Sequence, residues 1–341
     1  MKILLIMDPG IPVPPLKYGG IERIVALLGK EYENMGHQVT LLAGPESYCK
    51  GETIIYGKND PLRSGWQKMK ELLFVWNYLL KKKNQFDLVH NFGRLIYLLP
   101  ILNHNTMKIM SYQRSITPRN IRLIHKLPNK NLLFTACSDA CKATGNVAGN
   151  WHTIYNTVDF TAYSLATNVQ QNAPLMFLGR LAKIKGAHTA IQLAKKGKQP
   201  LWIAGNIPQE TQEAVYFEAS IANEIDGTQV KYLGELNDSE KNYYLSKSKA
   251  LLFPIEWEEP FGIVMIEAMA CGTPVIAFER GAVTEVIDET VTGFKVKTLD
   301  QMLEKIDLLQ SLDRTICRQR AAERFDITII AKQYLKLMDG K

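Results

Sequence analysis

The most informative run of this chain is FPIEWEEPFGIVMIEAMACGTPVIAFERGAVTEV, residues Phe253 to Val286. Good helix formers fill 263–271, Gly272 suits the left-handed end of a helix, and 275–278 is typical of a buried strand. Two carboxylates stand out, Glu259 just before the helix and Glu267 two turns inside it. The run is therefore predicted to fold as a helix followed by a strand.

The spacing of these two carboxylates indicates the kind of ligand that they bind. At a rise of 1.5 Å per residue, the eight positions from Glu259 to Glu267 cover roughly 12 Å along the helix axis. That is about the reach needed to hold hydroxyl-bearing rings on either side of one pyrophosphate. The unpaired N–H groups around 261–264 carry the partial positive charge that suits its phosphates. The pattern predicts a nucleotide-sugar site, and an amphipathic helix with solvated glutamates is the alternative.

The carboxylate pair and the following AMACGTPV, residues 268–275, resemble the donor-site signature of family 4 of the glycosyltransferases. The resemblance implies the GT-B fold, an α/β architecture of two Rossmann-like doubly wound parallel-sheet domains facing across a cleft. It also implies that Glu259 holds hydroxyls of the donor sugar and Glu267 those of the ribose. The donor contacts expected at the start of the helix are Phe261, Gly262 and Ile263.

The first loop of the chain, 8–20, joins an expected strand to an expected helix and ends in Gly19 and Gly20. Glycines there let the backbone approach a phosphate closely. The resemblance implies that both contact the donor pyrophosphate, and a plain strand-to-helix turn is the alternative. Neither a G-x-G-x-x-G fingerprint nor a G-x-x-x-x-G-K-[ST] loop is present, which argues against NAD binding and against a P-loop ATPase.

Strands in the first half are expected at 38–42, 88–90, 108–112 and 132–136. Their alternation with helical segments is typical of a parallel doubly wound sheet, whose ligands bind at the carboxyl ends of the strands. Three polar residues, His90, Gln113 and Arg114, fall at such ends. Many members of the resembled family carry a His-Asp pair where this chain has Gln113 and Arg114. The candidate acceptor or sugar contacts are therefore His90, Gln113 and Arg114, although His90 is also open to a structural role.

In the second half, a strand at 175–178 leads into the turn GRLAKIKG, 179–186. Arg180 offers a planar fork and Lys185 a mobile point charge, so the two can neutralise a diphosphate from both sides. The resemblance implies that they bind the donor phosphates. Together with Glu259 they are the predicted catalytic residues. The turns after the next two strands complete the predicted donor contacts: Gly205, Leu233 and Gly234.

Two domains are expected, because 341 residues suffice for two full cores. Residues 1–165 are predicted to form a Rossmann-like acceptor domain and 166–325 a Rossmann-like nucleotide-sugar donor domain. The polar segment 161–173 is the expected linker. The resemblance implies that a last helix, about 326–341, packs back onto the first domain.

The composition indicates where in the cell the protein acts and what kind of partner it has. The chain is 46% hydrophobic and 22% charged, with five scattered cysteines that fit free thiols in a reducing compartment, so a cytoplasmic location is expected. The net charge of +7 favours anionic partners, whether nucleotides, nucleic acid or an anionic membrane surface. The run WQKMKELLFVWNYLLKKK, 66–83, is predicted to be a core-packing helix. A peripheral contact with the inner face of a membrane is its alternative.

These features together predict a glycosyltransferase, and the resemblance implies that it is retaining, metal-independent and of the hexosyltransferase type. The donor is expected to be a nucleoside diphosphate sugar, a UDP-sugar by default, and the acceptor a glycan, a lipid-linked molecule or a small molecule. No cofactor, no metal and no nucleic-acid partner are expected. The alternatives are a nucleotide-sugar epimerase of the same fold and a non-catalytic nucleic-acid-binding protein.

Overall fold

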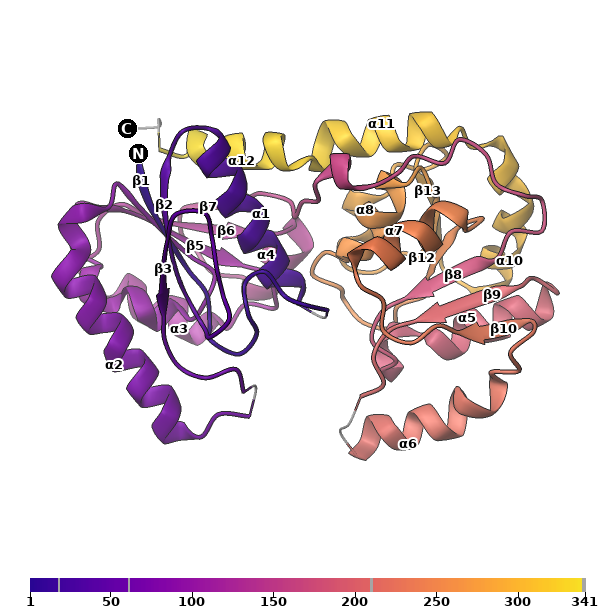
Figure 1. Ribbon diagram of the computed structural model, residues 1–341, viewed down its shortest axis with the longest axis horizontal. Coiled ribbons are helices and arrows are strands. Elements are labelled where there is room, and N and C mark those ends of the chain that lie inside the picture. The colour runs from indigo at the N-terminus through magenta and orange to yellow at the C-terminus, as the bar shows by residue number, and fades with distance from the viewer. Residues whose placement is uncertain (18, 61, 209–210, 339–341) are drawn as a thin grey trace. The chain divides into compact units, whose positions relative to one another are not determined.

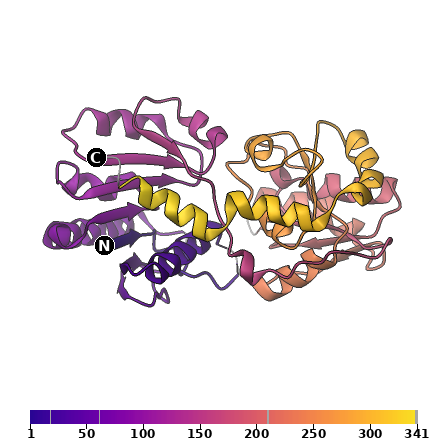
Figure 2. The same cartoon turned by 90° about the horizontal axis from the view of Figure 1, so that it is seen from above.

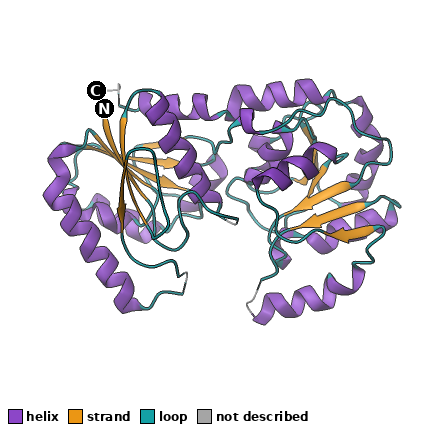
Figure 3. Cartoon of the chain, in the orientation of Figure 1, coloured by secondary structure: helices purple, strands orange, loops and turns teal. Residues whose placement is uncertain are grey.

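A computed structural model describes residues 1–17, 19–60, 62–208 and 211–338. The chain forms two compact units, Met1–Asn156 together with Ile327–Lys341, and Thr157–Asp326. Each unit is a parallel β-sheet with helices on both sides (Figure 3). Part of the first loop, at residue 18, and the end of the expected last helix, 339–341, lie outside the described residues.

The first unit is built on a seven-stranded sheet with the order β3-β2-β1-β4-β5-β6-β7. Figure 1 shows the helices that surround its strands. All of its strand pairs are parallel. The inner strands are covered on both sides, which explains why KILLI and LLFTA are nearly continuous apolar runs. The strands are β1 (Lys2–Ile6), β2 (Gln38–Ala43), β3 (Glu52–Ile55), β4 (Leu88–Asn91), β5 (Met107–Tyr112), β6 (Leu132–Ala136) and β7 (Trp151–Thr153).

Helices of the first unit begin where the sequence supplies caps. Ser64 accepts a hydrogen bond from Gln67 N while the Gln67 side chain accepts one from Ser64 N, so a capping box starts the second helix. The helices are α1 (Gly20–Asn34), α2 (Gly65–Lys82), η1 (Lys83–Gln85), η2 (Leu95–Ile101), α3 (Pro118–His125), α4 (Asp139–Gly145) and α12 (Ile327–Lys336). Within the described residues, no helix is long and apolar enough to cross a membrane.

The helix α12 belongs to the first unit although it comes last in the chain. It contacts α1 and lies across the strands of the first sheet (Figure 2). Ile330 and Tyr334 are fully buried there, and the Tyr334 ring lies 4.6 Å from the His90 ring on β4. The C-terminal helix therefore completes the core of the unit that the N-terminus begins.

The second unit holds a six-stranded sheet with the order β10-β9-β8-β11-β12-β13. The predicted helix at 263–271 and strand at 275–278 are confirmed as α8 and β12. The strands are β8 (Leu175–Leu178), β9 (Leu201–Ala204), β10 (Val230–Tyr232), β11 (Leu251–Phe253), β12 (Val275–Phe278) and β13 (Gly293–Val296). The helices are η3 (Phe160–Ala162), η4 (Lys183–Lys185), α5 (Ala187–Lys196), α6 (Thr211–Ser220), η5 (Ala222–Glu224), α7 (Asp238–Lys247), α8 (Ile263–Ala270), α9 (Val283–Val286), α10 (Leu299–Leu308), η6 (Leu309–Ser311) and α11 (Arg314–Phe325).

The second unit begins at Thr157 rather than at 166, and the segment 161–173 belongs to it. Thr157 Oγ1 donates a hydrogen bond of 2.8 Å to Phe325 O, and Arg314 Nε donates one of 2.6 Å to Ala166 O. A polar composition is typical of a linker, but here the arginine side chains of α11 bind the carbonyl groups of the segment. Tertiary hydrogen bonds of this kind leave no signal in the local sequence.

Candidate active site

The second unit has a switch point between β8 and β11, the two central strands. The chain adds β9 and β10 on one side of β8, then returns to add β11, β12 and β13 on the other. Ligands of open parallel sheets bind at the carboxyl ends of the strands on either side of such a point. The loop after β8 carries Arg180 and Lys185, and the loop after β11 carries Glu259. The structure thus brings the predicted catalytic residues to the expected edge of the sheet.

These two loops are bonded to each other. Glu256 N donates a hydrogen bond of 2.9 Å to Ile184 O. Gly186 has a φ of +77°, and a Cβ atom there would lie 2.0 Å from Pro254 O. Only glycine fits at this position, because the conformation and the close backbone contact both exclude a side chain. The loops therefore hold a fixed spacing.

Lys185 and Glu259 form an ion pair in this loop pair. Lys185 Nζ lies 2.5 Å from Glu259 Oε2, and the side chains are 22% and 12% exposed. Trp257 Nε1 donates a hydrogen bond of 2.8 Å to the same oxygen, while the Lys185 ammonium lies 5.1 Å from the Trp257 ring centre. Within the described residues nothing donates a hydrogen bond to Oε1, which leaves that oxygen available to a ligand hydroxyl.

The start of α8 is set by Gly262. Its φ is +83°, and a Cβ atom would lie 2.8 Å from Met265 Cε and 2.9 Å from Phe253 Cζ. Ile263 opens the helix, so its N–H belongs to the first turn. The Phe261 side chain is 2% exposed and its ring packs 5.9 Å from that of Phe325. Phe261 is therefore a core residue, and only its backbone remains for the predicted donor contact.

Glu267 is buried inside the second unit and has two partners that the sequence did not reveal. Its Oε1 accepts hydrogen bonds from Lys241 Nζ at 2.5 Å and from Tyr163 OH at 3.0 Å. Lys241 lies on the polar helix α7 and Tyr163 in the segment expected to be a linker, so neither was a candidate. Within the described residues nothing donates to Glu267 Oε2. Burial, together with the Glu267 charge, raises the pKa of the nearby Cys271 thiol to about 12.

The turns after β8, β9 and β10 lie side by side. Gly205 N donates a hydrogen bond of 2.9 Å to Gly234 O, and Leu233 N donates one of 2.8 Å to Ile203 O. A Cβ atom on Gly205, whose φ is +144°, would lie 1.8 Å from Gly179 O. The predicted contacts Gly205, Leu233 and Gly234 are thus gathered next to the residue that precedes Arg180.

In the first unit Gly19 and Gly20 stand at the start of α1. Gly19 has a φ of +149°, and a Cβ atom there would lie 2.6 Å from Pro15 Cβ. The position requires glycine for the turn itself. The contact of both residues with the donor pyrophosphate stays a prediction.

The first unit also has a switch point, between β1 and β4, and a cavity of about 870 Å³ opens at the strand ends beside it. Asp8, which follows β1, and Arg94, which follows β4, line it. So do Gln113 and Arg114 after β5, two of the three candidate acceptor contacts. The Gln113 Oε1 atom is buried and has no hydrogen-bond partner in the part of the chain that the structure describes.

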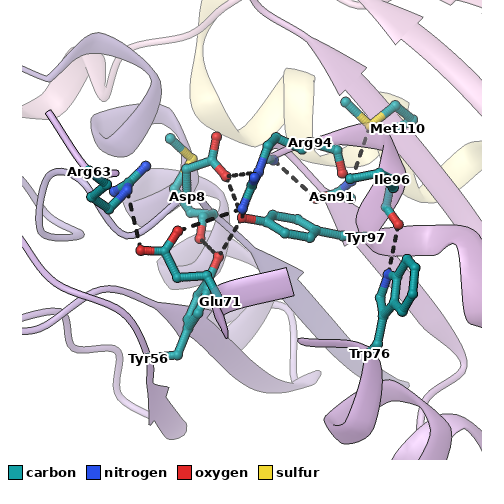
Figure 4. Close-up of polar contacts among 12 residues, drawn as sticks. Asp8, Tyr56, Arg63, Glu71, Trp76, Asn91, Arg94, Ile96, Tyr97 and Met110 are labelled. Carbon is teal, nitrogen blue, oxygen red and sulfur yellow. Dashed lines mark hydrogen bonds and ion pairs between the residues drawn. The ribbon is translucent and has the colours of Figure 1, made fainter. Parts of the chain in front are cut away.

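A cluster of buried and half-buried polar groups joins these loops to α2 (Figure 4). Tyr97 OH donates a hydrogen bond of 2.8 Å to Asp8 Oδ1 and accepts one of 2.6 Å from Arg94 Nη2. Arg94 Nη2 also lies 3.6 Å from Glu71 Oε2, and burial raises the pKa of the Glu71 carboxyl. Sequence reasoning missed Asp8, Glu71, Arg94 and Tyr97 as a group, because they come from three separate segments.

His90 is not available as an acceptor or sugar contact, which corrects that expectation. It is fully buried, with its Nε2 atom 2.7 Å from Ser111 Oγ and its ring 4.3 Å from that of Phe92. Burial lowers the pKa of His90 to about 3, so the imidazole is neutral at physiological pH. Tyr334 of α12 covers it, and the sequence alone does not place that helix.

Comparison with solved structures defines the class of the fold as GT-B. The glycosyltransferase AviGT4, involved in avilamycin A biosynthesis, aligns with a TM-score of 0.72 at 23% identity, over 100% of this chain and 98% of that one. HepE of Anabaena, in complex with UDP and glucose, aligns with a TM-score of 0.75 at 19% identity, over the whole of both chains. The predicted fold class is confirmed.

The sequence comparisons match the second unit to a family model. Residues 167–324 match the model described as glycosyl transferases group 1. A phosphatidyl-myo-inositol mannosyltransferase of Propionibacterium freudenreichii is 33% identical over 132 residues, which is 37% of this chain and 34% of that protein. Spore coat protein SA of Bacillus subtilis is 25% identical over 99% of both chains. The expected resemblance to glycosyltransferases is thereby confirmed, while membership of family 4 stays a prediction.

Proposed function

We propose that this protein is a retaining, metal-independent glycosyltransferase of family 4. It transfers a hexosyl group from a nucleoside diphosphate sugar, a UDP-sugar by default, to an acceptor held by the first unit. The observation that carries the proposal is the Lys185–Glu259 pair, which stands with Arg180 at the switch point of the unit that matches the glycosyl transferases group 1 model. A structural neighbour in complex with UDP-glucose supports the choice of donor.

Arg180, Lys185 and the first turn of α8 supply positive charge for the leaving group. As the bond from the sugar C1 to the phosphate oxygen breaks, its electron pair stays on the diphosphate and the sugar becomes cationic. Preorganised donors aimed at such a developing charge often contribute several kcal/mol each. The acceptor oxygen then bonds to C1, and its proton passes to the leaving phosphate. Retention and metal independence rest on the family resemblance.

The two glutamates each have one oxygen engaged by the protein and one left for a ligand. Glu259 Oε2 is held by Lys185 and Trp257, and Glu267 Oε1 by Lys241 and Tyr163. A carboxylate fixed in this way can accept hydrogen bonds from hydroxyl groups without first reorienting. We assign Glu259 Oε1 to the donor sugar and Glu267 Oε2 to the ribose. The free cysteine thiols and the overall composition support a cytoplasmic location as part of the proposal.

The epimerase alternative needs proton-transfer groups at the sugar carbons. His90, an obvious candidate by residue type, is buried and neutral in the first core. The comparisons favour neither this alternative nor the nucleic-acid-binding one.

The donor site is tested by thermal unfolding of the purified protein with UDP, GDP and ADP, without added metal. A ligand at a hundred times its dissociation constant should stabilise the protein by about 2.7 kcal/mol. One nucleotide is expected to stabilise the wild type, and Arg180→Gln and Glu267→Gln should abolish most of the shift. Lys183→Gln, an exposed cation on the same turn, is the matched control and should keep it. If no nucleotide stabilises the protein at millimolar concentration, the donor-site proposal is wrong.

A further inference from the structure

The cavity of the first unit has a charged end. Its charged lining residues are four cations and one carboxylate: Arg63, Lys68, Arg94, Arg114 and Asp8. The buried Glu71 pairs with Arg63 and Arg94 from behind. The buried carboxyl of Glu22 also interacts electrostatically with Arg114 and Asp8, and burial raises its pKa. Four cations against Asp8, Glu71 and Glu22 leave an excess of one positive charge when all three carboxyls are ionised, and of two when Glu22 is protonated. An excess of one to two positive charges matches a phosphate monoester or a diphosphate diester.

Arg63 has enclosed donor atoms at this end that the described residues do not satisfy by hydrogen bonds. Its side chain is 10% exposed, and Nε lies 3.3 Å from Glu71 Oε1. Within the described residues, however, no acceptor makes a hydrogen bond with the enclosed Nε and Nη1 atoms. Buried cationic donors without acceptors are costly, and native proteins leave few of them. A ligand oxygen in the cavity would satisfy them.

The rest of the cavity is apolar and partly open. Its wall is formed by residues of η2, of α3 and of the turn after α3: Leu95, Ile96, Leu99, Leu123, Ile124 and Leu127. Three of these six keep exposed surface, and Leu123 is 60% exposed. A monomeric protein rarely leaves such a patch beside a cationic pocket without a use. The shape of this lining, cationic at one end and aliphatic at the other, suits an amphiphile.

The neighbouring helix α2 extends the apolar surface. Its inner face packs with Leu72, Val75 and Leu79, as expected for a core-packing helix. A second stripe at helical spacing stays exposed outside that core, formed by Trp66, Met69, Leu73 and Leu80. Exposed lysines at 68, 70 and 81 lie on the same helix. This is the pattern of a helix that can lie at an anionic hydrocarbon interface.

We propose that the cavity binds the acceptor, and that the acceptor is an amphiphile with a phosphate group and a hydrocarbon chain. The phosphate lies against Arg63, Arg94 and Arg114, and the chain lies along the aliphatic wall toward α2. This inference rests on the proposed glycosyltransferase function, for which it names the acceptor class. The sugar-accepting hydroxyl belongs to the same molecule.

The test uses the full chain and three probes: octyl phosphate, octanol and inorganic phosphate, each measured by isothermal titration calorimetry. Octyl phosphate is expected to bind about tenfold or more tightly than either of the others, because only it fills both ends of the cavity. Arg114→Gln should weaken octyl phosphate about tenfold. Arg114 is 62% exposed, so this variant is expected to fold. Leu123→Gln should bring octyl phosphate toward the affinity of inorganic phosphate.

Two matched controls separate this site from other cationic surfaces. Arg122→Gln removes an exposed cation from α3 that does not line the cavity, and Arg180→Gln removes one from the donor site. Both should leave octyl phosphate binding unchanged. The inference is overturned if octyl phosphate binds no better than octanol or phosphate, or if Arg122→Gln weakens it as much as Arg114→Gln.

Nucleotide binding to the same samples distinguishes failure of this inference from failure of the proposed function. If UDP binds and octyl phosphate does not, only the acceptor assignment falls. If octyl phosphate binds in the cavity and no nucleotide binds the second unit, the amphiphile site stands and the glycosyltransferase proposal fails.

Discussion

His90 shows how one neighbour decides the role of a residue. It lies one residue before the end of β4, near the sheet edge where ligands bind, and by that criterion it was a candidate contact. In the folded unit it is enclosed by Ser111, Phe92 and Tyr334. The imidazole therefore stabilises the core as a neutral hydrogen-bonding ring.

The buried imidazole makes the free energy of unfolding depend on pH. The unfolded chain takes up a proton near pH 6.5, whereas the folded chain takes it up only near pH 3. Because the unfolded state binds more protons in that window, the stability contributed by neutral His90 is present above pH 6.5 and is lost as pH falls toward 3. Between about pH 6 and pH 5, the free energy of unfolding of the wild type should therefore depend on pH more steeply than that of His90→Gln. The difference in slope, measured by urea unfolding at each pH, should be up to about 1.4 kcal/mol per pH unit. If the free energy of unfolding changed with pH in the same way for the wild type and the variant, this account would be contradicted.

At the scale of elements, the donor site depends on two loops that share backbone contacts. Arg180 and Lys185 come from the loop after β8, and Glu259 from the loop after β11. The hydrogen bond from Glu256 N to Ile184 O ties them together. Gly186 allows the close approach.

Gly186→Ala is expected to disturb both stability and nucleotide binding, because its Cβ atom would lie 2.0 Å from Pro254 O. Gly227→Ala is the matched control: its φ is +71°, and among the described residues nothing beyond its chain neighbours lies within 4 Å of the added carbon. The control should lose only the cost of a left-handed conformation, about 1–2 kcal/mol. Gly186→Ala should lose clearly more in urea unfolding and should also weaken UDP binding. Equal losses for the two variants, with unchanged UDP affinity, would refute the argument.

At the scale of the whole molecule, the chain crosses from the first unit to the second at Asn156 and returns at Ile327. The last helix, α12, therefore stabilises the unit that the N-terminal half of the chain forms. Tyr334, 1% exposed, fills the space over His90. Its contribution belongs to the first unit, although it follows the second unit in sequence.

Tyr334→Ala is expected to destabilise the first unit by about 3–5 kcal/mol, the usual cost of removing a large aromatic side chain from a core. Hydrogen exchange should show faster exchange of the β1 and β4 amides, while those of β8 and β11 stay protected. Tyr48→Ala, in the same unit but 67% exposed, should change neither. Equal acceleration in both sheets would show that the two units unfold together.

Local pattern predicted α2, α8 and most of the strands, whereas β3 and β13 were not expected. Chain length and the family resemblance predicted the two-unit α/β architecture. Continuous apolar runs predict strands buried on both faces, and the 253–286 run predicted α8, β12 and the carboxylate spacing. These signals are local because helix and strand periods, glycine turns and helix ends depend on neighbouring residues. The sequence also predicted which cations follow the β8 strand.

The tertiary structure determined which side chains bond to one another. Lys241 and Tyr163 hold Glu267, and an arginine of α11 binds the carbonyl of Ala166 in the expected linker. The Asp8, Arg94 and Glu71 cluster gathers three distant segments around one cavity. The hydrophobic periodicity of the sequence does not predict such pairings, because they depend on strand order and on the path of the last helix. Those contacts fix which oxygens and which charges remain for a ligand.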